Sequence, residues 1–231
     1  MRRKKRRGAW GIPLLLICVM MLTAGCQKTS ATPEAASGKI NNTTGILLVN
    51  AANPLPEDAE PKDLVNLYEM KRHFLLARSD IYLEREAFEA ADRMFKQAED
   101  ENLNGFILTG GYRSREKQQE LFETRQDDTV QAPGCSEHET GLAFDVTARS
   151  NTEGFETTPQ FAWLSEHCWD YGFILRYPQG KEAITGIAYE PWHYRYVGTE
   201  AAAVIRKNSW TLEEYCLLER DRKSTRLNSS H

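Results

Sequence analysis

The chain has 231 residues, 41% of them hydrophobic, which suits a single domain with one packed core. It carries 29 basic and 33 acidic residues, and six of the basic ones lie within the first seven positions. Without those six, 23 basic residues face 33 acidic ones, a net charge of −10. No basic patch remains, so nucleic acid is excluded as a partner, and we expect ligand binding to depend on a local pocket.

The N-terminal segment, residues 1–26, places a basic start before an apolar run of about 16 residues, which is typical of a secretory signal and short for a membrane span. Its last five residues, LTAGC, resemble a bacterial lipoprotein box, so we expect a lipid on Cys26 to anchor the protein to the membrane. The leucine lies four residues before the cysteine, so ordinary cleavage near Gly25 and an uncleaved anchor remain alternatives. Residues 27–44 are polar and predict a flexible tether. The folded domain, residues 45–220, is therefore expected outside the cytoplasm, in the bacterial cell envelope.

The first half of this domain predicts two strands and two helices. Residues 46–50 predict a short strand, and residues 86–102 have apolar side chains at the spacing of a core-facing helix. Residues 105–109 predict a buried strand that leads to Arg113, where Ser114 can cap the helix that carries Gln118.

Arg113 is a candidate functional residue because it lies between the end of a strand and the start of a helix. A guanidinium there can bind a carboxylate or a developing oxyanion, and Gln118, just over one helical turn further on, can assist it. The alternative is a surface ion pair, which the sequence alone favours.

Two later stretches contain residues that can bind a metal. In residues 136–146, Phe144 and Val146 alternate with Asp145, which places Asp145 on the opposite face of a strand, a short distance after His138. Further on, Pro191 predicts an extended segment around His193. Two imidazoles and a carboxylate suit a catalytic zinc ion, which keeps one coordination position open.

A candidate general base stands beside these ligands. Glu190 is three residues from His193 and could take a proton from an attacking water. The spacing of these residues alone does not establish a catalytic site.

The remaining elements complete an α+β prediction: a small antiparallel sheet flanked by helices, with the metal site at the sheet. Thr158 and Pro159 start a helix that stops at Gly172, and residues 173–177 and 192–197 predict strands. Residues 179–186, after Pro178, predict a turn between these strands. Residues 201–206 and 212–219 predict closing helices. His167 lies off the apolar stripe of its helix and is expected to face solvent rather than a metal.

The cysteines and the C-terminal segment add two further expectations. Cys135, Cys168 and Cys216 are an odd number in the exported domain, so at least one thiol should be free, and Cys135 is expected to be a small buried loop residue rather than a ligand. Residues 221–231 lack apolar periodicity and resemble translated sequencing-adapter sequence, so we expect the native C-terminus to be missing or replaced there.

Four stretches carry a family resemblance: LLVNAANPLP (47–56), GYRSREKQQELF (111–122), SEHETGLAFDV (136–146) and YGFILRYPQGKEAITGIAYEPWHYRYVG (171–198). In this order they resemble the VanY-type D-alanyl-D-alanine carboxypeptidases, zinc peptidases that trim bacterial cell-wall stem peptides. The resemblance runs from about residue 47 to residue 205. It implies one Zn²⁺ per chain, held by His138, Asp145 and His193, with Glu190 as catalytic base. It also implies substrate contacts through Arg113, Gln118, Ser136 and Tyr177.

The function implied is release of the terminal D-alanine from peptidoglycan stem peptides by a monomer. Glu190 would activate the water, while zinc and Arg113 would stabilise the oxyanion. One alternative is an L,D-carboxypeptidase acting on tetrapeptide stems, since the same motifs are common to both. Another is a non-catalytic cell-wall binding module, but such a module has no need of a base such as Glu190.

Overall fold

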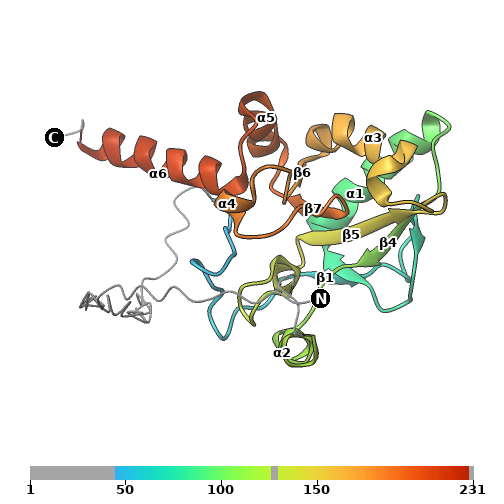
Figure 1. Cartoon of the computed structure of the whole chain (residues 1–231), viewed down its shortest axis with the longest axis horizontal. Helices are drawn as coiled ribbons and strands as arrows, with labels where there is room; N and C mark the ends of the chain where they lie inside the picture. The colour runs from blue at the N-terminus through green and yellow to red at the C-terminus, as the bar shows by residue number, and fades with distance from the viewer. Residues whose placement is uncertain (1–44, 126–129, 229–231) are drawn as a thin grey trace, which may run out of the picture. The chain divides into compact units, whose positions relative to one another are not determined.

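A five-stranded sheet in the order β2-β4-β5-β7-β6 forms the centre of the protein (Figure 1). The computed structural model describes residues 45–125 and 130–228. The strands are β2 (Leu75–Leu76), β4 (Phe106–Gly110), β5 (Ala143–Ala148), β6 (Phe173–Leu175) and β7 (His193–Tyr196). All neighbours pair antiparallel except β2 and β4, which run parallel. A second, two-stranded antiparallel sheet pairs β1 (Leu64–Asn66) with β3 (Tyr82–Glu84).

Helices surround the central sheet, which confirms the predicted α+β fold. Helix α1 (Arg85–Asp100) packs on one face, where the ring of Phe95 lies 4.9 Å from that of Phe106 and 6.0 Å from that of Phe144. The other α-helices are α2 (Arg115–Thr124), α3 (Pro159–His167), α4 (Glu182–Thr185), α5 (Thr199–Asn208) and α6 (Leu212–Asn228). Three 3₁₀ helices are η1 (Glu137–Thr140), η2 (Phe155–Thr157) and η3 (Cys168–Tyr171).

The predicted helix boundaries are confirmed at three caps. Ser114 and Thr158 each accept a backbone hydrogen bond in the first turn of their helices, from Lys117 and Phe161 respectively. Pro159 is the first residue of α3, where the fixed φ of proline suits a helix start. Gly172 follows η3 with φ of 82°, a left-handed conformation that glycine adopts at low cost.

Three local predictions need correction. Residues 46–50 do not form a strand, and one reason is that the carbonyl of Leu47 accepts from the guanidinium of Arg195 instead of pairing with a neighbouring strand. The expected turn after Pro178 contains the short helix α4. Helix α6 continues to Asn228, beyond the predicted end at residue 219 and into the segment expected to be a separate tail.

Among the described residues, Cys135, Cys168 and Cys216 form no disulfide. Cys135 is only half-buried, whereas the prediction had it buried, and Cys168 and Cys216 are buried. The predicted signal, the tether and Cys26 lie outside the described residues. Within residues 45–125 and 130–228, no helix is both long enough and apolar enough to cross a membrane.

The two faces of the central sheet have different chemistry. Phe144, Val146 and Tyr194 point into the hydrophobic core, so the alternation of a strand turns Asp145 and His193 to the other face. Asp145 and His193 are direct partners in the antiparallel pairing of β5 with β7. This register places a carboxylate beside an imidazole.

Candidate metal centre

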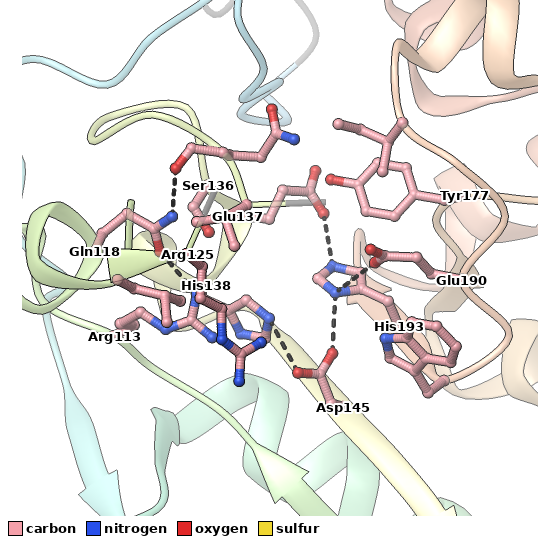
Figure 2. Close-up of a pocket in the computed structure, with 15 residues that line it drawn as sticks. Arg113, Gln118, Arg125, Ser136, Glu137, His138, Asp145, Tyr177, Glu190 and His193 are labelled. Carbon is pink, nitrogen blue, oxygen red and sulfur yellow. Dashed lines mark hydrogen bonds and ion pairs between the residues drawn. The ribbon is translucent and has the colours of Figure 1, made fainter. Parts of the chain in front are cut away.

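Three side chains from separate elements converge beside β5 (Figure 2). His138 comes from η1, Asp145 from β5 and His193 from β7. His138 Nε2 lies 3.3 Å from Asp145 Oδ2, and His193 Nδ1 lies 3.1 Å from Asp145 Oδ1. Ligand atoms of all three lie within 4.8 Å of one another. Four donors at zinc–ligand bond lengths of about 2.0–2.1 Å lie about 3.3 Å apart in a tetrahedron, which the two distances to Asp145 match, so the three residues could hold a single ion.

The surrounding backbone holds His138 and Asp145 in place. The Nδ1 atom of His138 lies 2.8 Å from the carbonyl oxygen of Gly111, which leaves Nε2 facing Asp145. A Cβ at Gly110 would lie 2.5 Å from Asp145 Oδ2, so only glycine leaves room for the carboxylate. The GlyGly pair before Tyr112 therefore serves the metal centre.

The electrostatics of the centre favour a positive charge. Burial opposes ionisation of Asp145, but His138 and His193 hold its pKa well below the ordinary range. Burial also disfavours a protonated His193, yet its interactions with the carboxylates of Asp145 and Glu137 raise its pKa to about 9. A divalent cation would meet the same attraction from these carboxylates.

Glu190 lies beside the three ligands rather than among them. Its Oε2 atom is 3.8 Å from His193 Nδ1, and the side chain is buried. Burial, aided by the charges of Asp145 and Glu137, raises the pKa of Glu190 to about 7. A carboxyl group with such a pKa is suited to accepting and releasing a proton.

A cavity of about 180 Å³ opens beside this centre and collects the four predicted substrate-binding residues, Arg113, Gln118, Ser136 and Tyr177. Arg113 Nη1 donates to Gln118 Oε1 at 2.7 Å, and Gln118 donates in turn to the carbonyl of Gln131. Tyr177 packs its ring 5.0 Å from that of His193. Arg113 therefore lies in the cavity with its guanidinium held by an amide rather than by a carboxylate.

A wider groove adjoins this cavity. It has a volume of about 700 Å³ and shares Arg113, Leu121 and Arg125 with the cavity. A ligand whose end occupies the cavity could therefore continue along the groove.

The sequence prediction missed a buried ionic cluster behind His193. Arg176 and Arg195 both bind Glu137, and Arg176 also binds Glu213. Arginine and glutamate are mostly exposed in proteins, so nothing in the local pattern singled these residues out. The one available signal was that Arg195 is two residues after His193 in a strand and so shares its face.

The other histidine considered, His167, is not part of the centre. Its ring stacks on Trp163 with 4.5 Å between centroids, and the side chain is half-buried rather than fully solvent-facing.

Two histidines and an aspartate that could hold a metal ion lie next to a carboxyl group with a pKa of about 7, and this combination is suited to metal-assisted hydrolysis. Residues 80–199 match the family model described as VanY, D-alanyl-D-alanine carboxypeptidase, and the chain belongs to this family. It is 41% identical to YodJ of Bacillus subtilis (strain 168), which is assigned as a carboxypeptidase, over 76% of this chain and 68% of that protein. It is 36% identical to a D-alanyl-D-alanine carboxypeptidase of Enterococcus faecium over 74% of this chain and 56% of that protein.

Solved structures of carboxypeptidases have a similar fold. The LdcB LD-carboxypeptidase superimposes with a TM-score of 0.66 at 39% identity, covering 73% of this chain and 83% of that one. A VanY D,D-pentapeptidase variant in complex with Zn(II) superimposes with a TM-score of 0.60 at 33% identity, covering 73% of this chain and 96% of that one.

Proposed function

We propose that this protein is a zinc-dependent D-alanyl-D-alanine carboxypeptidase that removes the C-terminal D-alanine from peptidoglycan stem peptides. The observation that carries the proposal is the convergence of His138, Asp145 and His193 beside Glu190, in a cavity that also contains Arg113. Membership of the VanY family supports the reaction, and the Zn(II) complex of a VanY neighbour supports the metal.

The donor set is the one that zinc prefers, two imidazole nitrogens and one carboxylate oxygen. His138 would bind through Nε2 and His193 through Nδ1, the nitrogens that face Asp145. When bound, zinc supplies a positive charge that polarises the scissile carbonyl and makes a water easier to deprotonate.

The side chains of the chain itself would carry the proton and stabilise charge. Glu190 would accept a proton from the attacking water while the oxygen of that water bonds to the carbonyl carbon. When the C–N bond breaks, Glu190 would return that proton to the amine of the departing D-alanine. Arg113, which Gln118 orients, would donate hydrogen bonds to the developing oxyanion.

The remaining cavity residues would hold the substrate. Ser136 and Tyr177 line the cavity beside the ligands, so they would contact the terminal residue. The upstream part of the stem peptide would leave through the groove that shares Arg113, Leu121 and Arg125 with the cavity.

A second candidate is cleavage of an L,D bond in a tetrapeptide stem. The similarity to the LdcB LD-carboxypeptidase, at 39% identity, favours considering it. The residues proposed for the chemistry are the same in both reactions, so the choice of substrate rests on the rest of the cavity.

The decisive experiment incubates the purified protein with pentapeptide and tetrapeptide muropeptides and follows the loss of D-alanine by mass spectrometry. We expect one D-alanine from the pentapeptide, no release with a chelator present, and recovery when zinc is added back. Cleavage of the tetrapeptide alone would indicate the L,D reaction, and binding without cleavage of either would indicate a non-catalytic module. Release that a chelator leaves unchanged would contradict the metal-dependent mechanism.

We further propose that the protein acts outside the cytoplasm, attached to the membrane through Cys26 and the tether of residues 27–44. The basic and apolar segment that ends in LTAGC supports this placement. Detergent phase partitioning of the expressed protein and of its Cys26→Ala variant tests it. A wild-type protein found wholly in the aqueous phase would count against lipidation.

A further inference from the structure

Two buried atoms behind the metal centre face each other without hydrogen bonds. Glu137 Oε2 lies 3.5 Å from His193 Nε2 (Figure 2). Neither atom has a hydrogen-bond partner among the described residues, and both are shielded from solvent. An unsatisfied buried polar atom is costly, so this pair would gain by a small approach to hydrogen-bonding distance.

The other oxygen of Glu137 is already fully used. Its Oε1 atom accepts from Arg176 Nε at 2.7 Å and from Arg195 Nη1 at 2.8 Å. Any rotation that brought the carboxylate into the cavity would break both of these bonds. Glu137 is therefore fixed with its free oxygen directed at the imidazole, and it is not available as a fourth metal ligand.

The two arginines are themselves anchored. Arg176 donates to both carboxylate oxygens of Glu213, at 2.9 and 2.6 Å, and Arg195 donates to the carbonyl of Leu47 at 2.7 Å. Two guanidinium groups and two carboxylates make the cluster neutral overall, so Glu137 can keep its charge although it is 1% exposed.

The geometry points to Glu137 as a positioning residue for the metal centre, one that accepts a hydrogen bond from His193 Nε2–H. This bond would fix the proton on Nε2 and so present the Nδ1 lone pair to the ion; the inference rests on the metal site proposed above. The Gly111 carbonyl does the equivalent for His138 through Nδ1. A carboxylate behind a metal-binding histidine orients the ring and strengthens it as a ligand.

The competing explanation is that Glu137 serves only to neutralise two buried arginines. Glu213 provides a matched control, because it binds the same Arg176 but makes no contact with His193 among the described interactions. We would compare zinc affinity, by competition with a chromogenic chelator, in wild type, Glu137→Gln and Glu213→Gln. The melting temperature of each metal-free protein gives the structural effect separately.

We expect Glu137→Gln to weaken zinc binding about 10- to 100-fold. Glu213→Gln should lower the melting temperature but change zinc affinity by less than about twofold, because its charge lies outside the centre. Equal zinc affinity in Glu137→Gln and wild type would overturn the inference. An equal loss of affinity in both variants would also overturn it, since the effect would then come from the ionic cluster alone.

A measurement on the wild type covers the case in which Glu137→Gln does not fold. In the zinc-loaded protein, ¹⁵N–¹H spectra of labelled histidines should show the proton of His193 on Nε2. A proton on Nδ1 would overturn the inference. Failure of the wild type to release D-alanine would contradict the proposed function, whereas the affinity comparison and the tautomer would still test the role of Glu137.

Discussion

Two glutamates lie on opposite sides of His193, and their surroundings give them different properties. Glu137 faces Nε2 and Glu190 lies on the Nδ1 side, and both are buried. Burial alone would raise both pKa values, but Arg176 and Arg195 hold the pKa of Glu137 well below its usual range. Glu190 lies outside that arginine cluster, and its pKa rises to about 7. The same kind of side chain is thus a fixed charge on one side of the ring and, on the other, a group whose pKa suits it to exchange a proton.

The largest effect on activity should follow from replacing Glu190, the one of these two glutamates proposed as the base. We expect Glu190→Gln to lower kcat about 10²- to 10⁴-fold, because the amide cannot accept the proton of the attacking water. Zinc affinity and the melting temperature should stay close to wild type, since Glu190 is outside the arginine cluster. Steady-state D-alanine release, measured together with zinc content, checks this. A variant that retained more than about a tenth of wild-type kcat would remove Glu190 as the base.

Replacing Arg195, which binds Glu137 on the side away from the cavity, should lower the stability of the fold. Arg195→Met removes one of the two guanidiniums from Glu137 and leaves the Leu47 carbonyl without that donor. We expect the free energy of unfolding to fall by about 3–5 kcal/mol in chemical denaturation, because a buried ion pair loses one partner.

Arg206→Met is the matched control for this change. Arg206 is exposed and lies 3.7 Å from Asp170, so its replacement should cost less than about 0.5 kcal/mol. Similar losses of unfolding free energy in the two variants would show that the buried ionic cluster behind His193 contributes no more than an exposed ion pair.

The difference between the cavity residues and the buried ionic cluster behind His193 also explains which residues the sequence could predict. His138, Asp145 and His193 stand in short motifs, and the alternation of Phe144 with Asp145 gave the face of β5 correctly. Glu190 was recognised by its spacing from His193. These residues are close in sequence to one another or to a motif, so local pattern could nominate them, but their roles came from the family resemblance and not from their spacing.

The buried ionic cluster behind His193 joins residues that are far apart in the chain. Arg176 and Glu137 are separated by 39 positions, and Arg195 and Leu47 by 148. No periodicity reports such a contact, and buried arginines are too uncommon to be expected. The parallel strand β2 was missed for a related reason, because two residues are too few to show a period.

A smaller effect on activity should come from replacing Arg113. It lines the cavity with Glu190, but it donates hydrogen bonds whereas Glu190 would accept a proton. Arg113→Lys keeps the charge and loses the planar fork that can bind Gln118 and an oxyanion together. We expect kcat to fall about 10²-fold, in kinetics of D-alanine release, with zinc content unchanged.

Arg85→Lys is the control for this substitution, since Arg85 pairs with Asp63 at the surface. It should leave kcat unaltered. An Arg113→Lys variant with wild-type kcat would show that a point charge is sufficient in the cavity.

The smallest effect should come from His167, which has a ring like that of His193 but different neighbours. Its imidazole stacks on Trp163, and that indole remains anchored by its own hydrogen bond to Glu101 at 2.7 Å. We therefore expect His167→Gln to change stability by less than about 0.5 kcal/mol and to leave one zinc per chain. His193→Gln, made in parallel, should lose the metal, because it removes the imidazole nitrogen that faces Asp145. Loss of zinc from His167→Gln would mean that a histidine remote from both carboxylates can still control the centre. In that case the nearby carboxylates of Asp145 and Glu137 would not explain why His193, and not His167, binds the metal.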